Sequence, residues 1–210
     1  MGENGRLVHP ATGPLEPEPA PRPGQPAVDQ SQFRTVMSRF ATGVTVLTVG
    51  GEHCHGMTAN AFGSVSLSPP LVLCCVARTA RMHEAITAQR RFAVSMLGAD
   101  QEAVARYFTD RRRPQGAVQF DRVDWVAGPY SGAPLLSGSL AWVECALTEC
   151  YDGGDHSIFL GAVLGCGYGP DRSALLFFGG DFHQVMSQSP AQQPAGAGRP
   201  RGETGRCWLA

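Results

Sequence analysis

Short apolar runs separated by brief connections constrain this fold more than any other feature of the sequence. Two such runs, 44–49 and 71–76, are rich in residues that favour strands. Further strands are expected at 55–59, 64–67, 92–97, 120–126, 139–151, 156–167 and 174–182. Most connections are too short for the crossover helices that parallel strands need. The sequence therefore predicts a mainly β domain, an antiparallel barrel with a few peripheral helices.

Three helices are expected beside these strands. Asp29 can cap the first helix, and Gly43 is expected to end it. Apolar residues recur along it with helical spacing at Phe33, Val36, Met37 and Phe40. The second helix is expected from Thr79 to about Gln89. The third follows Asp100, with Val104, Tyr107 and Phe108 on one face.

Both ends of the chain differ in composition from the middle. Residues 1–28 hold seven prolines and few large apolar residues, which predicts a disordered arm. Residues 187–210 are rich in Gln, Pro, Gly, Ala and Arg, which predicts a disordered tail. The intervening 29–186 has the usual size of one domain.

Composition excludes several classes of function. The 17 basic and 18 acidic residues nearly cancel, so general nucleic-acid binding is not expected. All basic residues are Arg, which excludes Schiff-base chemistry on Lys. No apolar stretch approaches the length of a membrane span, and residues 1–29 lack the apolar central segment of a secretory signal. The seven cysteines form no CxxC pair and are expected to be reduced, as in a cytoplasmic protein.

Three segments carry groups that could bind a ligand. Residues 56–70 interleave small residues with hydroxyls, although an ordinary turn between strands is the simpler interpretation. Residues 75–83 join a strand to a helix start with Arg78 and Arg81, which suits a phosphate or an exposed surface equally well. Residues 153–161 place His156 after a Gly-Gly turn, where a lone His is usually just exposed.

Two further groups point less clearly to a site. His53 and His55 flank Cys54 and have the spacing of metal ligands, but no third or fourth ligand is identifiable, so no metal is predicted. The run 111–113 consists of three arginines. It is expected to be a solvated loop after a helix.

Taken in order, these segments resemble the flavin reductase-like family, over about residues 30–186. The likeness rests on Phe33-Arg-x-x-Met37, Phe40-Ala-Thr-Gly-Val-Thr-Val-Leu-Thr48, Gly56-Met-Thr-Ala-Asn60, Ser64-Val-Ser-Leu-Ser-Pro-Pro-Leu-Val72, Arg78-Thr-Ala-Arg-Met-His83, Phe92-Ala-Val-Ser-Met-Leu97, Phe108, Gly154-Asp-His156 and Phe177-Phe-Gly-Gly-Asp-Phe-His183. The resemblance implies an antiparallel Greek-key split β-barrel, the FMN-binding split barrel. It implies an NAD(P)H:flavin oxidoreductase that supplies diffusible reduced flavin to a partner flavin-dependent monooxygenase.

The resemblance also implies roles for individual residues. The flavin-binding set is Thr45, Met57, Thr58, Ala59, Asn60, Ser64, Val65, Ser66, Cys75, Ala77, Arg78, Arg81, Met82, His83 and Phe108. Within it, residues near 75–83 would hold the phosphate end. The alternative role of the arginine run 111–113, beside a solvated loop, is to help hold a flavin dinucleotide. His156 and Phe182 would contact the nicotinamide cofactor. The last strand often ends in Gly-x-Tyr-His in this family, whereas here Phe182 replaces the tyrosine and has no hydroxyl to donate.

Hydride transfer from a nicotinamide to a flavin needs aligned rings rather than a protein nucleophile or an acid–base residue. FMN and FAD both remain candidates. NADH is favoured over NADPH, because no pair of basic residues obviously awaits a 2′-phosphate. A homodimer is implied by the resemblance. The alternatives are a flavin-binding electron carrier without NAD(P)H activity, which would not need His156, and a self-contained oxidase, which would need a substrate pocket.

Overall fold

The computed structural model describes residues 28–170 and 172–185. The predicted tail, and the predicted arm except Val28, therefore lie outside the described residues. The chain divides into two units, residues 1–37 and 38–210. In the first unit, helix α1 (Gln30–Met37) begins after Asp29, whose carboxylate accepts a hydrogen bond from the backbone N–H of Gln32 at 3.1 Å. The predicted cap is confirmed.

Helix α1 ends earlier than the sequence suggests. Gly43 was expected to end it, but Thr42–Gly43 forms strand β1, which pairs with β11 (Leu175–Phe178). None of the α1 residues is buried, and the side chains of Phe33 and Val36 are 56% and 61% exposed. Within its own unit, α1 therefore leaves its apolar side chains exposed.

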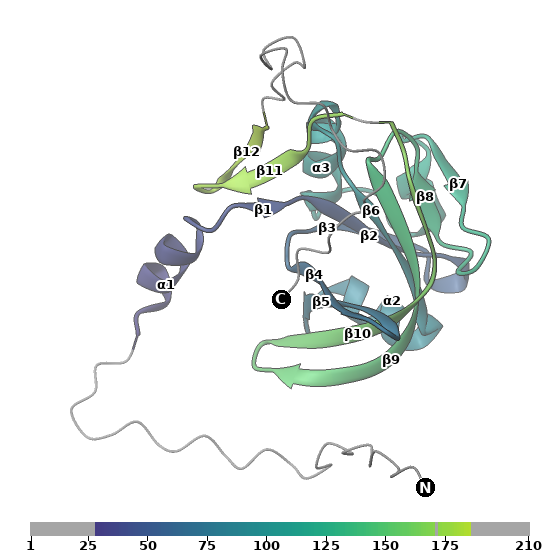
Figure 1. Ribbon diagram of the computed structural model, residues 1–210, viewed down its shortest axis with the longest axis horizontal. Coiled ribbons are helices and arrows are strands. Elements are labelled where there is room, and N and C mark those ends of the chain that lie inside the picture. Colours follow the sequence, from purple (N-terminus) through teal and green to yellow (C-terminus); the bar gives the residue numbers. More distant parts are fainter. Residues whose placement is uncertain (1–27, 171, 186–210) are drawn as a thin grey trace, which may run out of the picture. The chain divides into compact units, whose positions relative to one another are not determined.

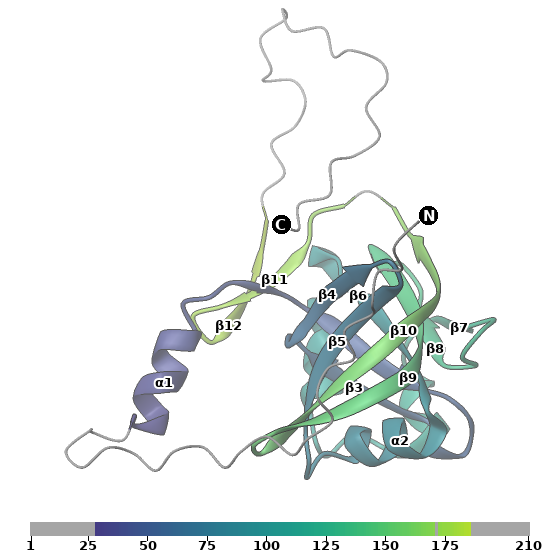
Figure 2. The ribbon, with the colours of Figure 1, turned by 60° about the horizontal axis from the view of Figure 1, so that its bottom comes forward.

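The second unit is built on one seven-stranded antiparallel sheet (Figures 1 and 2). Its strands are β2 (Thr45–Val49), β3 (His55–Ala59), β4 (Phe62–Leu67), β5 (Pro70–Ala77), β6 (Arg91–Met96), β9 (Ala141–Gly153) and β10 (His156–Tyr168). The order in the sheet is β3-β2-β6-β9-β10-β5-β4. Strands β3 and β4 follow each other in sequence, yet they form opposite ends of the sheet. The predicted antiparallel Greek-key split barrel is confirmed.

The strands expected at 120–126 and 174–182 are wrong in detail. Residues 116–120 form a short 3-10 helix, and β7 (Trp125–Ala127) follows and pairs with β8 (Pro134–Leu136). The expected strand over 174–182 is a hairpin of β11 and β12 (Asp181–Gln184). Gly179 and Gly180 form its turn, with φ of +63° and +90°, a region open to glycine.

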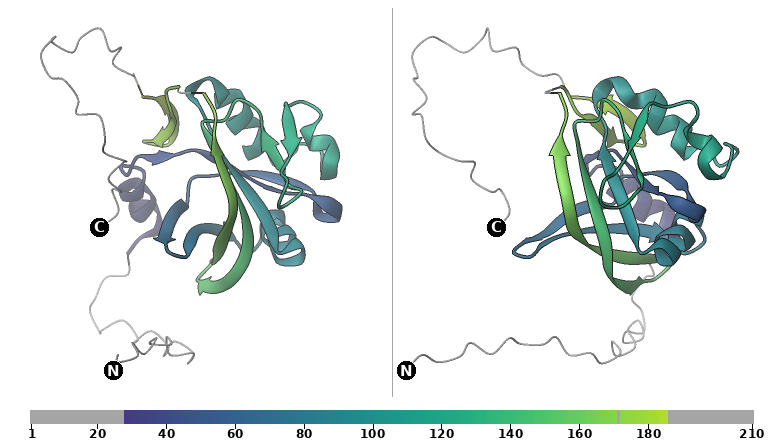
Figure 3. Two further views of the ribbon diagram at one scale, coloured as in Figure 1. Left: turned by 45° about the vertical axis from the view of Figure 1, so that its right-hand side comes forward. Right: turned by 90° about the vertical axis from the view of Figure 1, so that its right-hand side faces the viewer.

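Two helices cover the barrel, as Figure 3 shows. Helix α2 (Arg81–Gln89) buries Met82 and Ile86 in a core formed mainly by β2, β5 and β6. Helix α3 (Glu102–Thr109) buries Phe108 in a second core. Within 28–170 and 172–185, no helix has both the length and the apolarity that crossing a membrane requires.

Candidate functional site

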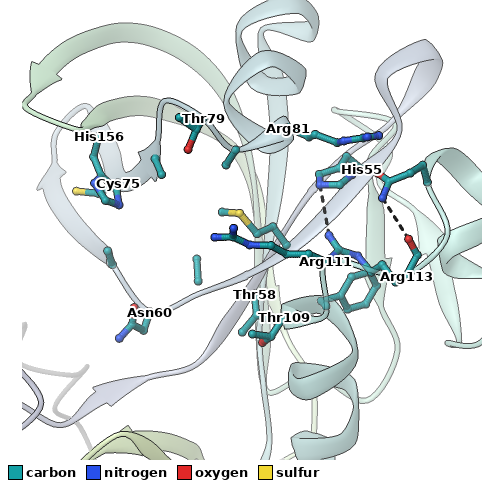
Figure 4. Close-up of a pocket in the computed structure, with 17 residues that line it drawn as sticks. His55, Thr58, Asn60, Cys75, Thr79, Arg81, Thr109, Arg111, Arg113 and His156 are labelled. Atoms are coloured by element: carbon teal, nitrogen blue, oxygen red, sulfur yellow. Dashed lines mark hydrogen bonds between the residues drawn. The ribbon is translucent and has the colours of Figure 1, made fainter.

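A cavity of about 490 Å³ opens between the two ends of the seven-stranded sheet. Strand β3 forms one end of the sheet, and β5 lies next to the other. Residues lining the cavity come from these strands, the start of α2, the end of α3 and the β9–β10 hairpin. They are His55, Met57, Thr58, Ala59, Asn60, Ala61, Cys75, Ala77, Thr79, Ala80, Arg81, Phe108, Thr109, Arg111, Arg113, Gln115 and His156 (Figure 4). The volume suits a cofactor-sized ligand.

The wall on β3 is held in place by two threonine hydroxyls. Thr45 Oγ1 donates to the carbonyl oxygen of Ala59 at 2.7 Å, and Thr58 Oγ1 donates to that of Ala105 at 2.7 Å. Both hydroxyls are therefore used within the protein. Thr45 lies behind the cavity and acts through Ala59, while Met57, Ala59 and Asn60 line the wall.

Gly56, at the start of this wall, allows α3 to pack closely. A Cβ atom at this position would lie 2.5 Å from Cε1 of Phe108, which is fully buried. From the sequence, Gly56 is one of the small residues of the possible ligand-binding segment 56–70. The structure gives Gly56 another role, because it makes room for the Phe108 ring that closes the cavity.

The opposite wall ends at a helix N-terminus. Strand β5 ends at Ala77, and α2 begins with Arg81 after Ala80, whose side chain cannot cap it. The positive end of the α2 dipole and the Arg81 guanidinium favour an anion at this point. Cys75 also faces the cavity. Burial raises the pKa of its thiol, so the neutral form, a poor nucleophile, dominates at pH 7.

Arg113 ties the loop after α3 to strand β3. Its Nη1 donates to the carbonyl oxygen of Asp110 at 2.8 Å, and its Nη2 donates to the carbonyl oxygen of Gly56 and to Nε2 of His55, the latter at 3.3 Å. The side chain is 9% exposed and its guanidinium lies over the Phe108 ring. Figure 4 shows Arg111 beside it, with its guanidinium pointing into the cavity.

His55 stays neutral because of these surroundings. Burial, followed by the positive charges of Arg113 and Arg81, lowers its pKa to about 4. A guanidinium only donates hydrogen bonds, so Nε2 of His55 is the acceptor and the ring proton sits on Nδ1. The cationic end of the cavity therefore consists of Arg81, Arg111 and Arg113, without a contribution from His55.

His156 lies across the cavity from this cationic end (Figure 4). It begins β10 after a turn in which Gly154 has φ of +78°, and its Nδ1 lies 2.7 Å from the Asp155 carboxylate. Arg78 supports the same hairpin, because its guanidinium contacts the Asp152 carboxylate at 2.6 Å. His156 is thus held at the rim of the cavity, where it could contact a second ligand beside one bound in the cavity.

The structure brings together nine of the residues predicted for the site. They are Met57, Thr58, Ala59, Asn60, Cys75, Ala77, Arg81, Phe108 and His156. The others do not line this cavity. Thr45 and Arg78 support its walls, and Ser64, Val65 and Ser66 lie on the neighbouring strand β4.

Three of these residues face elsewhere. Met82 is fully buried beneath α2, and Nε2 of His83 lies 2.8 Å from the Ser157 hydroxyl. The Phe182 ring packs against Phe177 with centroids 5.5 Å apart, so its contact with a nicotinamide stays a prediction.

The resemblance did not identify several residues that do line the cavity. They are His55, Ala61, Thr79, Ala80, Thr109, Arg111, Arg113 and Gln115. The run 111–113 is the clearest signal for them in the sequence, although three consecutive arginines mainly predict a solvated loop. For His55, the sequence indicates only the spacing of a metal ligand with His53. The described residues contain no group of three or more potential ligands for a metal.

Comparison with known proteins identifies the family. A family model described as the flavin reductase like domain matches residues 37–186. The chain belongs to this family. Flavin reductase like relatives include an NADH-dependent FAD reductase from Streptomyces globisporus, 56% identical over 156 residues, which are 74% of this chain and 86% of the relative.

Two other relatives of this flavin reductase like protein extend the comparison. The reductase subunit HsaB of a flavin-dependent monooxygenase from Rhodococcus jostii is 36% identical over 80% of this chain and 84% of its own. A solved structure of the NADH:FAD oxidoreductase SgcE6 from Streptomyces globisporus, in complex with NAD and FAD fragments, aligns with a TM-score of 0.71 and 52% identity. It covers 79% of this chain and 96% of that one.

The residues of the cavity fit a flavin nucleotide. Met57, Ala59 and Phe108 offer apolar surface for a planar ring, and Arg81 and Arg111 offer donors for a phosphate. The apolar surface and the phosphate donors lie within one cavity, as the ring and the phosphate of a flavin nucleotide require.

Proposed function

We propose that this protein is an NADH:flavin oxidoreductase that reduces FMN or FAD and releases the reduced flavin to a separate flavin-dependent monooxygenase. The observation that carries the proposal is the cavity with an apolar wall, a cationic end and His156 on the facing rim. The names of the relatives from Streptomyces and Rhodococcus support the same activity and the same kind of partner.

When bound, the flavin would supply the acceptor for a hydride, a proton with two electrons, from NADH. The protein holds the two rings together. Among the residues that line the cavity, Met57 and Ala59 would position one face of the flavin, Arg81 and Arg111 would hold its phosphate, and His156 would orient the nicotinamide nucleotide. Phe108 closes the cavity floor and keeps water away.

Catalytic turnover tests the activity directly. Purified protein should oxidise NADH only after FMN, FAD or riboflavin is added, measured as the loss of absorbance at the nicotinamide band. A flavin carrier would instead purify with tightly bound yellow flavin and would leave NADH unoxidised. That second result would contradict the proposal.

His156 provides a sharper test of the two ligand positions. His156→Ala is expected to raise the NADH KM and to leave the flavin Kd unchanged, because His156 lies on the rim away from the three arginines. A lost hydrogen bond of about 1–3 kcal/mol lowers kcat/KM roughly five- to a hundred-fold. Cys150→Ala, an exposed position on the same hairpin, is the control. Loss of flavin binding with unchanged NADH dependence would reverse the assignment.

We also propose a homodimer with the flavin site near the subunit interface. The exposed side chains of Phe33 and Val36 on α1, and of Val65 and Leu67 on β4, support it, because apolar surfaces favour burial against a partner. Sedimentation at micromolar concentration should give twice the chain mass. A fully active monomer would contradict this proposal.

The cytoplasm is the compartment that this chemistry favours. NADH is available there, and thiols such as the exposed Cys150 and Cys166 stay reduced.

A further inference from the structure

A side-chain hydrogen bond joins helix α2 to strand β10. Nε2 of His83, in the first turn of α2, lies 2.8 Å from the hydroxyl of Ser157, the second residue of β10. Ser157 is 5% exposed, and the His83 ring also packs against the buried ring of Phe159, with centroids 5.0 Å apart. The bond is therefore shielded from water, where losing it costs more than losing an exposed hydrogen bond does.

Each end of this bond lies beside a residue that lines the flavin cavity. Arg81 comes two positions before His83, and residues two apart on a helix do not share a face, so Arg81 reaches the cavity while His83 faces the sheet. His156 comes one position before Ser157, and successive residues of a strand point to opposite faces. Figure 4 shows Arg81 and His156 in the same cavity. The bond connects the backbone segments that carry them.

The other buried side chains of α2 fix its position less sharply. Met82, Ala85 and Ile86 are apolar and belong to the same core as Val76 of the neighbouring strand β5. Apolar contact has no directional preference, whereas a hydrogen bond weakens steeply when its geometry is distorted. The bond between His83 and Ser157 therefore restricts small displacements of the helix start that the apolar contacts tolerate.

We infer that His83 is a positioning residue for hydride transfer, which fixes the place of the flavin phosphate at Arg81 relative to the nicotinamide nucleotide at His156. The inference rests on the proposed reductase function and on these two contacts. Hydride transfer needs the two rings close and aligned, and a displacement of about 1 Å can slow such a step about a hundredfold. A flavin bound alone needs Arg81 but not His156, so its affinity does not depend on the bond.

His83→Phe tests the inference, because phenylalanine keeps a ring against Phe159 and cannot form the hydrogen bond. Anaerobic stopped-flow reduction of FMN gives the rate at saturating NADH and the NADH concentration that gives half of it. The saturated rate is expected to fall about tenfold. The half-saturating concentration and the Kd of FMN, measured by flavin fluorescence, should change less than about twofold. His83→Gln, whose amide can bond to Ser157, should recover most of the rate.

Two further variants make the test independent of how well His83→Phe folds. Ser157→Ala removes the same bond from the strand side and should slow reduction to a similar extent. The double variant should be no slower than either single one, because both changes remove one shared interaction. Thr87→Val is the matched control on the exposed side of α2, since its hydroxyl donates within the helix, to the carbonyl oxygen of His83. It should leave the rate and both affinities unchanged.

Three outcomes would overturn the inference. An unchanged saturated rate in both His83→Phe and Ser157→Ala would show that the bond does not align the rings. FMN binding weakened as much as the rate would mean that His83 contacts the flavin itself. His83→Gln as slow as His83→Phe would assign the effect to the ring and not to the bond. Lower stability alone would produce none of the expected changes, because the saturated rate is that of the folded protein. A wild-type protein that leaves NADH unoxidised with every flavin would instead refute the reductase proposal.

Discussion

Arg113→Met is expected to lower the free energy of unfolding by about 2–4 kcal/mol. Methionine replaces most of the packed length of the side chain but donates no hydrogen bonds. The carbonyl oxygens of Gly56 and Asp110 and Nε2 of His55 would lose their charged donor in a buried environment. Urea unfolding at neutral pH measures the change.

The same substitution should also weaken flavin binding by more than tenfold. Arg113 fixes the loop that carries Arg111 and Gln115 into the cavity, so its loss frees two lining residues at once. Arg112→Met is the matched control, because that side chain is 90% exposed and, among the described residues, bonds only to Asp110. The control should change stability by less than about 0.5 kcal/mol. Equal effects of the two substitutions would show that the buried network does not hold the site.

His55 should make the protein less stable as the pH falls from 6.5 to about 4. Its folded-state pKa of about 4 lies below the ordinary value of 6.5, so across this window the unfolded chain binds a proton that the folded chain does not. The contribution of neutral His55 to the free energy of unfolding is therefore fully present above pH 6.5. It is lost as the pH falls towards 4. The gap between the two pKa values corresponds to roughly 3 kcal/mol.

His55→Gln isolates this contribution, because the amide oxygen can still accept from Arg113 and does not titrate. Unfolding free energies measured by urea at pH 7 and pH 4.5 should differ less in the variant than in the wild type. Lowered pKa values at Asp110 and Asp152 also reduce stability in acid, but these carboxylates titrate below the window of His55. Parallel pH profiles for the two proteins would refute the role of His55.

The sequence predicts the fold well because most elements are specified locally. The β-branched run of β2 and the Asp29 cap of α1 determine structure within a few residues. The predicted elements are wrong where apolar residues favour a strand and nearby glycines favour a turn. Residues 174–182 are apolar enough for one strand, but Gly179 and Gly180 adopt positive φ and turn the chain back.

The site is less predictable, because long-range contacts decide which side chains reach the cavity. Met82 and His83 follow Arg81 directly, yet helix geometry buries Met82 and turns His83 towards Ser157. Arg113 looks like its exposed neighbour Arg112 in sequence. Only the approach of β3, more than fifty residues earlier in the chain, gives it a buried role.

The cavity lies where the seven-stranded sheet is open, so binding of a ligand in it affects the stability of the folded protein. Strands β3 and β5 belong to opposite ends of the seven-stranded order, and in the described residues they meet across this cavity. A nucleotide that contacts both strands therefore bridges two ends of the sheet that do not pair directly, and so stabilises their arrangement. At a hundred times its Kd, such a ligand adds about 2.7 kcal/mol to stability. In a cell, the amount of folded protein would then rise and fall with the supply of its own flavin.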